Sequence, residues 1–340
     1  MSNFPYVKFK AVSWKDTLQG LIISAMKPNG HPDLSILRVK LGPLELKTPL
    51  VAASGTFGYG SEYSELADVQ NFGAITLKAV SLEPRKGNPY PRIVETPSGM
   101  LNSIGLENPG FDVFLSEKLP EASRIGVPLI ANLVGDKIGD YAELASRLDK
   151  IESLVALEIN VSCPNVEHGY SSFATDPEII GKLVASVRSH TSKPVIAKLS
   201  PNVTDIIPIA KAARDNGADI LNLCNTFLGM SICVDTRRSR IARDHGGLSG
   251  HAIRPLALRI VHQVASVMDM PIIGTGGIYD TTDALEFIIA GARAVSLGTV
   301  NFIHPDRSAR ICREITDYLK TNSLTLNELT GSYLGPPQSI

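Results

Sequence analysis

The segment KPVIAKLSPNVTDIIPIAKAARDNGADILNLCN, residues 193–225, contains a short apolar run, a helical pattern and a second apolar run. The helical pattern covers Val203–Asn216, and Gly217 follows directly, which is a common signal for the end of a helix. Both apolar runs are almost continuously hydrophobic, as expected for strands buried on both faces of a parallel sheet. The segment therefore predicts a strand–helix–strand unit.

The same unit recurs along most of the chain. Further helical patterns cover Asp140–Lys150, Asp176–Ser189, Ala252–Val267 and Thr282–Ala290. Eight apolar runs that alternate with helical patterns favour a closed (β/α)8 TIM barrel over an open, doubly wound α/β sheet. The eight apolar runs are PLVAASG (49–55), GAITLKAV (73–80), VPLIANLVG (127–135), LVALEINVS (154–162), KPVIAKLS (193–200), ADILNLCN (218–225), MPIIGTGGI (270–278) and ARAVSLGTV (292–300).

Domain organisation follows from the same pattern. No linker or change in composition divides residues 35–340, so we expect a single domain there, preceded by an N-terminal extension over residues 1–34. Near-helical spacing of apolar residues in the extension favours a helix lying across the domain; a membrane-surface helix is the alternative, but the basic excess typical of one is missing. The segment VKLGPLELK (39–47) predicts a β-hairpin lid. The connections 81–112 and 226–250 are long enough to be functional or to carry structure of their own.

Composition narrows the possible partners. The chain of 340 residues has a formal net charge of -1 and 20% charged residues, which argues against a nucleic-acid or anionic-membrane partner. Its four cysteines lie far apart with no C-x-x-C pair, which argues against an iron–sulfur or zinc site within this chain. We find no signal-peptide pattern and no apolar run long enough to span a bilayer, so a soluble, cytoplasmic protein is expected.

Polar residues follow the apolar runs at the strand ends where a barrel of this kind builds its active site. Lys78 and Lys198 are the most informative, because a buried lysine is costly unless it meets an anion or an acceptor. We favour a functional role for both over a structural salt bridge. The other strand-end residues are Ser54, Gly55, Asn132, Asn160, Cys163, Asn225, Thr226, the glycines of GTGG (274–277), Gly298 and Thr299.

The segment LEINVSCPNVEHG (157–169) changes from an apolar strand into a polar loop at Cys163–Pro164. Its thiol, amides and imidazole are candidates for catalysis, although a buried cysteine that packs as a small apolar residue is the alternative. The glycines of GTGG and of LGT (297–299) would let backbone N–H groups approach a phosphate, although glycines also form plain tight turns. A phosphate-binding site together with amides and lysines fits the cofactor flavin mononucleotide (FMN). No group of His, Asp or Glu residues has the spacing of metal ligands.

These residues belong to specific motifs: ASGTFGYG (53–60), ITLKAV (75–80), GNPYPR (87–92), GMLNSIGLENPG (99–110), ANLVG (131–135), EINVSCPNVEHG (158–169), KLSPNVTDI (198–206), NTFLGM (225–230), GGLSG (246–250), GTGGI (274–278) and LGTVNF (297–302). Over about residues 35–318 the chain resembles dihydroorotate dehydrogenase of class 1, in particular the class 1B catalytic subunit. The resemblance implies FMN-dependent oxidation of dihydroorotate to orotate in pyrimidine biosynthesis.

The resemblance also assigns residues. It implies that Cys163, as a thiolate, removes the C5 proton of dihydroorotate while a hydride passes from C6 to N5 of FMN; a thiol is a better base near neutral pH than an alcohol. The implied FMN-binding residues are Ser54, Lys78, Ala79, Asn132, Asn160, Lys198, Cys224, Gly250, Gly276, Gly277, Gly298 and Thr299. The substrate-binding residues are Lys78, Asn102, Ser103, Ile104, Gly105, Leu106, Asn160, Asn225 and Thr226, to which the polar character of the substrate adds Asn165.

Partners are implied as well: a homodimer, and an iron–sulfur and FAD electron-transfer subunit that would complete a heterotetramer and pass electrons to NAD. Fumarate or a quinone would be the alternative acceptors. The residues Arg243, Asp244 and His245 depart from the family pattern and place the lid or partner surface in question. Two other functions compete: a related FMN-dependent pyrimidine oxidoreductase, and a flavin-free phosphate-binding barrel, an aldolase or synthase with a lysine Schiff base.

The variant Cys163→Ala tests the role of the thiol. It should retain bound FMN but lose most of its dihydroorotate oxidation, because it lacks the base that takes the C5 proton. The measurement is anaerobic flavin reduction by dihydroorotate. Reduction at a near-normal rate would remove Cys163 from the mechanism.

Overall fold

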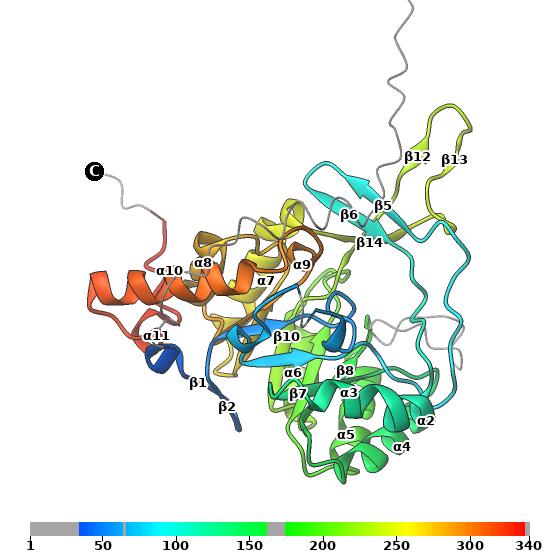
Figure 1. Cartoon of the computed structure of the whole chain (residues 1–340), viewed down its shortest axis with the longest axis horizontal. Helices are drawn as coiled ribbons and strands as arrows, with labels where there is room; N and C mark the ends of the chain where they lie inside the picture. Colours follow the sequence, from blue (N-terminus) through cyan, green and yellow to red (C-terminus); the bar gives the residue numbers. More distant parts are fainter. Residues whose placement is uncertain (1–33, 64–65, 162–173, 337–340) are drawn as a thin grey trace, which may run out of the picture. The chain divides into compact units, whose positions relative to one another are not determined.

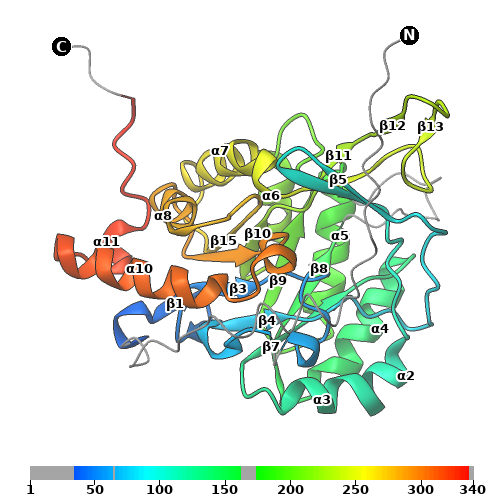
Figure 2. The same ribbon diagram turned by 45° about the horizontal axis from the view of Figure 1, so that its top comes forward.

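The computed structural model describes residues 34–63, 66–161 and 174–336. Within these ranges eight parallel strands form a closed barrel in the order β10–β15–β16–β3–β4–β7–β8–β9 (Figure 2). All eight predicted strands and the TIM-barrel architecture are confirmed. The strands are β3 Leu50–Ala52, β4 Ala74–Thr76, β7 Leu129–Leu133, β8 Leu154–Asn160, β9 Val195–Leu199, β10 Ile220–Leu223, β15 Ile272–Thr275 and β16 Ala294–Leu297.

Helices cover the outside of the barrel, with α7, α8 and α10 on one side and α2, α3 and α4 on the other (Figure 1). The five predicted helices are confirmed. Only α6 begins clearly later than predicted, at Ile207 instead of Val203, because Pro208 in its first turn is suited to a helix start. The helices are α2 Phe111–Val113, α3 Leu119–Ser123, α4 Ile138–Asp149, α5 Pro177–Arg188, α6 Ile207–Asp215, α7 Arg254–Ala265, α8 Thr281–Ile289, α9 Val300–Ile303, α10 Arg307–Asn322 and α11 Leu326–Leu329.

The barrel interior follows from the alternation of side chains along each strand, which turns every second residue inward. The first inward positions form a buried apolar layer to which each of the eight strands contributes one residue: Val51, Ala74, Ile130, Ala156, Ile196, Ile220, Ile273 and Ala294. The hairpin of β1 (Val39–Leu41) and β2 (Leu44–Leu46) packs its apolar side chains into the same cluster. The predicted hairpin lid therefore closes the N-terminal end of the barrel and leaves the C-terminal end of the strands, which we call the open end, uncovered by the hairpin.

The two long connections carry structure of their own, as predicted. Within them β5 (Ile93–Thr96), β6 (Gly99–Asn102), β14 (Gly246–Ser249) and β11 (Phe227–Gly229) form one antiparallel sheet, which we call the loop sheet. The pairing of β6 with β14 joins segments that lie far apart in the sequence. Figure 1 shows this sheet beyond the barrel, next to the short hairpin of β12 (Ile232–Cys233) and β13 (Arg238–Ser239).

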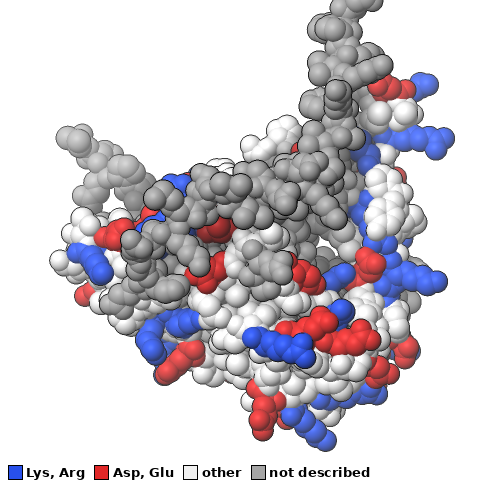
Figure 3. Space-filling view, in the orientation of Figure 1, with Lys and Arg blue, Asp and Glu red and all other residues white. Residues whose placement is uncertain are grey.

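Charged residues of both signs are interspersed over the described part of the face in Figure 3. Among the residues that the structure describes, no helix combines the length and apolar character needed to cross a bilayer. The charge pattern thus resembles the even balance of Lys and Arg with Asp and Glu seen in the composition.

The hairpin under the barrel should contribute measurably to stability. Leu41 is fully buried in the apolar layer, so Leu41→Ala should lower the free energy of unfolding by about 2–5 kcal/mol through lost burial and a cavity. Urea unfolding of the purified protein measures this. The neighbouring Lys40 is exposed on the other face of β1, and Lys40→Ala should change stability by no more than about 0.5 kcal/mol. Equal effects of the two substitutions would contradict the packing of the hairpin.

Candidate active site

Polar side chains occupy the next inward positions, two residues further along most strands. Seven of the eight positions are polar and buried: Thr76, Asn132, Glu158, Lys198, Asn222, Thr275 and Ser296. The eighth is Ala53. We call these residues the polar band. It lies directly above the apolar layer, because successive inward residues on a strand are separated by about 7 Å.

Glu158 lies at the centre of the polar band and is fully buried. One carboxylate oxygen accepts a hydrogen bond from Asn132 Nδ2 at 2.7 Å, and the other accepts one from Asn222 Nδ2 at 2.6 Å. Asn222 Oδ1 in turn accepts the Thr275 hydroxyl at 2.5 Å. Lys198 Nζ lies 3.9 Å from Glu158 Oε1. Lys198 therefore has the carboxylate neighbour that the salt-bridge alternative requires, and its functional role stays a prediction.

The third inward positions reach the open end of the barrel, and many predicted site residues occupy them. Lys78, Asn160 and Gly298 are partly buried there, whereas Cys224 is buried. The Asn160 side chain accepts a hydrogen bond from Asn225 Nδ2 at 3.1 Å, and its carbonyl accepts one from the Tyr141 hydroxyl of α4 at 3.0 Å. The structure thus brings together residues at the ends of β4, β8, β10 and β16 that the sequence places far apart.

Asn225 and Thr226, directly after β10, are linked to each other, and Thr226 is linked to Asn202 in the loop after β9. Asn225 Oδ1 accepts the N–H of Thr226 at 2.8 Å, and the Thr226 carbonyl accepts from Asn202 Nδ2 at 3.0 Å. Asn202 Oδ1 also accepts the N–H of Leu228 at 2.9 Å. Asn202 therefore fixes the start of the second long connection from both sides.

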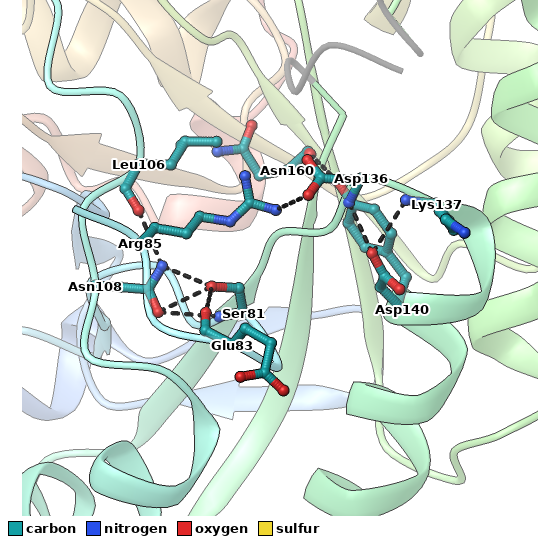
Figure 4. Close-up of polar contacts among 10 residues, drawn as sticks. Ser81, Glu83, Arg85, Leu106, Asn108, Asp136, Lys137, Asp140 and Asn160 are labelled. Atoms are coloured by element: carbon teal, nitrogen blue, oxygen red, sulfur yellow. Dashed lines mark hydrogen bonds and ion pairs between the residues drawn. The ribbon is translucent and has the colours of Figure 1, made fainter. Parts of the chain in front are cut away.

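The loop predicted to bind substrate, residues 102–106, is held by Asn108 (Figure 4). Asn108 Nδ2 donates to the Leu106 carbonyl at 2.9 Å and to the Ser81 hydroxyl at 2.8 Å. Asn108 Oδ1 accepts the N–H groups of Ser81 at 3.2 Å and Gly110 at 2.9 Å. Asn108 is almost fully buried, and this cluster ties the end of the loop at Leu106 to Ser81 in the chain that leaves β4.

Two arginines extend this support. Arg85 forms an ion pair with Asp136 at 2.9 Å and so connects the loop to the residues after β7 (Figure 4). Arg243 donates two hydrogen bonds to Asn88 Oδ1, at 3.2 and 3.0 Å, and Asn88 Nδ2 donates to the Ser103 carbonyl at 3.1 Å. The exposed departure at Arg243, Asp244 and His245 is thus linked to the predicted substrate loop through Asn88.

The predicted phosphate glycines have different structural reasons. Gly276 and Gly277 have φ values of +132° and +76°, and a Cβ on Gly277 would lie 2.5 Å from the backbone nitrogen of Arg254 at the start of α7. Gly250 has φ +98°, and a Cβ there would lie 2.6 Å from Gly99 Cα. A Cβ on Gly298 would meet its nearest neighbours only at 3.7 and 3.9 Å. Packing explains the first three glycines, whereas the end of β16 has free space.

The remaining predicted residues are placed as follows. The Ser54 hydroxyl donates to the Leu77 carbonyl at 2.8 Å, the Thr299 hydroxyl donates to that of Ser249 at 2.8 Å, and Ala79 is buried. Asn102 Nδ2 donates to the Gly247 carbonyl across the loop sheet at 3.2 Å. The predicted residues Cys163, Asn165 and His168 lie outside the described residues.

Comparison with known proteins identifies the family. A family model for dihydroorotate dehydrogenase matches residues 36–319. A relative from Geotalea daltonii is 50% identical over 302 residues, which cover 88% of this chain and 98% of the relative. One from Geobacter metallireducens is 50% identical over 303 residues, covering 89% and 98%. Both are described as dihydroorotate dehydrogenase B (NAD(+)), catalytic subunit.

This chain belongs to the dihydroorotate dehydrogenase family. The predicted resemblance and the predicted activity, oxidation of dihydroorotate to orotate in pyrimidine biosynthesis, are confirmed. The match covers the barrel and the loop sheet, so the motifs that carried the resemblance lie within it. A flavin-free aldolase or synthase is no longer needed to explain the strand-end lysines.

Sequence reasoning missed the residues that support the site. Glu158 lies in the motif EINVSCPNVEHG (158–169), where it is a carboxylate inside an otherwise apolar strand. The period of two along β8 could have found it, since Ala156, Glu158 and Asn160 share one face of the strand. Asn88, Asn108 and Asn202 act through contacts with distant segments, for which the sequence holds no local signal.

The cysteines of the described residues should differ sharply in reactivity. Burial raises the pKa of the Cys224 thiol to about 12, although the nearby Lys198 ammonium acts in the opposite direction. Hydrogen bonds from Thr236 lower the pKa of the Cys233 thiol. At pH 8 only about one Cys224 thiol in ten thousand would be ionised.

Iodoacetamide at pH 8 should therefore alkylate Cys233 in the native protein and leave Cys224 unmodified until urea is added. The rate at Cys233 should rise with pH as its thiolate forms. Peptide mass spectrometry reads out each site separately. Alkylation of native Cys224 as fast as that of Cys233 would show that the third inward position of β10 is open to solvent.

Proposed function

We propose that this chain is an FMN-dependent catalytic subunit whose flavin and substrate bind at the open end of the barrel. The observation that carries the proposal is the polar band, which is buried directly below the strand-end residues. Asn132, Glu158 and Lys198 are the members on which the proposal depends. A barrel interior without a polar ligand would be filled by apolar layers, because buried polar groups are costly. When bound, FMN would accept the hydride that leaves C6 of dihydroorotate.

The polar band has hydrogen-bonding capacity left for such a ligand. Asn132 Oδ1 and Ser296 Oγ are buried, and neither atom has a hydrogen-bond partner among the described residues. Buried polar atoms are nearly always paired, so these unpaired atoms indicate a missing partner. The ring edge of a flavin offers both N–H and carbonyl groups, which suits the acceptor of Asn132 and the ammonium of Lys198.

The phosphate of FMN would lie at the ends of β15 and β16, where barrels of this class commonly bind phosphate. The free space at Gly298 supports this position, because nothing in the packing of β16 requires a glycine there. Gly276 and Gly277, which have positive φ values, are partly buried directly after β15 at the same end of the barrel. Thr299 follows Gly298 directly, and its hydroxyl donates to that of Ser249 beside the same position.

Dihydroorotate would bind between the strand ends and residues 102–106. Its carboxylate and amide groups need donors and acceptors, which Lys78, Asn102, Asn225 and Thr226 can supply. Asn160 would lie between substrate and flavin, since it is linked to Asn225 on one side and lies on β8 beside Lys198 in the register. We propose Cys163 as the base that takes the C5 proton, a role that rests on the family motif, and Asn165 as a further substrate residue, a role that rests on the polar character of the substrate.

The partners follow from the relatives. Because those relatives are described as catalytic subunits linked to NAD, we propose that electrons leave this chain through an iron–sulfur and FAD subunit that reduces NAD. We further propose a homodimer of this chain within a heterotetramer, a cytoplasmic location, and a single FMN-binding domain over residues 35–340 with an extension over residues 1–34.

An anaerobic titration tests the proposed function. The purified chain incubated with FMN and passed through gel filtration should retain the flavin, and dihydroorotate should then bleach the visible flavin band. NAD should be reduced only after the electron-transfer subunit is added, because the proposed function places FMN in this chain and the iron–sulfur and FAD centres in that subunit. Failure to retain flavin would contradict the cofactor; NAD reduction by this chain alone would contradict the need for a partner.

A further inference from the structure

We propose that Glu158 is a positioning residue that sets the orientation of the amides and the net charge beneath the flavin, and so keeps the reduction potential of bound FMN low. The inference rests on the proposed FMN site. It concerns a residue that never touches substrate in this arrangement, because the carboxylate lies one inward position below the strand end, under Asn160.

The burial of Glu158 argues for a function. The residue is fully buried in the barrel, and Lys198 beside it is 6% exposed. Removing a carboxylate and an ammonium from water is costly, and well-packed apolar side chains usually stabilise a fold as well as a buried ion pair does. The barrel has such packing one layer below, with Ala156 and Ile196 on the same two strands. Stability alone therefore gives no reason for charges at this level.

The hydrogen bonds show what the carboxylate does to its neighbours. An ionised carboxylate accepts hydrogen bonds and donates none, so it forces Asn132 and Asn222 to turn their NH2 groups toward it. The amide oxygen of Asn132 is left unpaired as a result, and that of Asn222 accepts the Thr275 hydroxyl. Donors thus face both carboxylate oxygens, and the Lys198 ammonium lies 3.9 Å from one of them.

The charge of Glu158 acts in the opposite direction to that of Lys198. Reduction of a flavin gathers negative charge at the edge of the ring, and a cation beside that edge stabilises the reduced form. A carboxylate 3.9 Å from the Lys198 ammonium offsets this effect in a buried, poorly screened environment. The pair thus keeps the donor groups of the Lys198 ammonium while cancelling much of its field. A lower potential would favour passing electrons on to an acceptor of low potential.

The variant Glu158→Gln tests the inference, because it keeps the size of the side chain and removes the charge. The potential of bound FMN is measured by anaerobic reductive titration against a redox dye. We expect a rise that changes the ratio of reduced to oxidised flavin at least tenfold at a fixed potential, which corresponds to about 30 mV for a two-electron couple. An unchanged potential in a variant that binds FMN would overturn the proposal.

Asp149→Asn provides a matched control. Asp149 is a carboxylate at the end of α4, on the N-terminal side of the barrel, where it accepts hydrogen bonds from Thr191 and Ser192. Its loss should lower stability without moving the flavin potential. Equal shifts in the two variants would show a general loosening of the fold and would contradict a specific role for Glu158.

Glu158→Asp separates position from charge, and it carries the test if Glu158→Gln does not fold. The shorter side chain keeps the charge but withdraws from Asn132 and Asn222, so the dissociation constant for FMN should rise at least tenfold while the potential stays close to wild type. An unchanged affinity would overturn the positioning role. If the wild-type chain itself binds no FMN, the proposed function fails; if it binds FMN and the variants behave like wild type, only the role of Glu158 fails.

Discussion

The closed interior of the barrel is the constraint on which the rest of the structure depends. Eight parallel strands turn every second side chain into one enclosed space, so each inward residue must suit its level. At the N-terminal end the space is apolar and covered by the hairpin of β1 and β2. Two residues further along, the same strands carry amides, hydroxyls, a lysine and a glutamate. The change from apolar to polar side chains separates the packed layer of the barrel from the proposed binding site.

The polar band would be unstable as a set of isolated groups, and Glu158 connects it. Its carboxylate satisfies two amides from neighbouring and more distant strands and lies close to a lysine. The side chains at the strand ends lie directly above this connected layer. The layer limits the space in which those side chains can reorient. A site built on rigid strands in this way holds its geometry more accurately than one built on loops alone.

The barrel could be predicted from the sequence because its signals are local. Short apolar runs, helical periods and glycines after helices identified all eight strands and five helices, and Asn160, Lys78 and Lys198 stood out as polar interruptions at strand ends. The support of the site could not be predicted in this way. Asn108 acts on Ser81, and Arg243 on Asn88, through contacts that exist only after distant segments have met. The ion pair at Lys198 was likewise hidden until β8 and β9 were placed side by side.

The loop sheet has a consequence for how such a site can change. Met100, Leu101 and Asn102 of β6 are in register with Ser249, Leu248 and Gly247 of β14. A Cβ on Gly247 would lie 2.3 Å from the Thr226 hydroxyl, so the segment before α7 also packs closely on the chain leaving β10. Neither β6 nor β14 can therefore be shifted or exchanged by itself without breaking the backbone ladder that the two strands share. Recombination between related barrels would have to transfer the two connections together to move substrate preference intact.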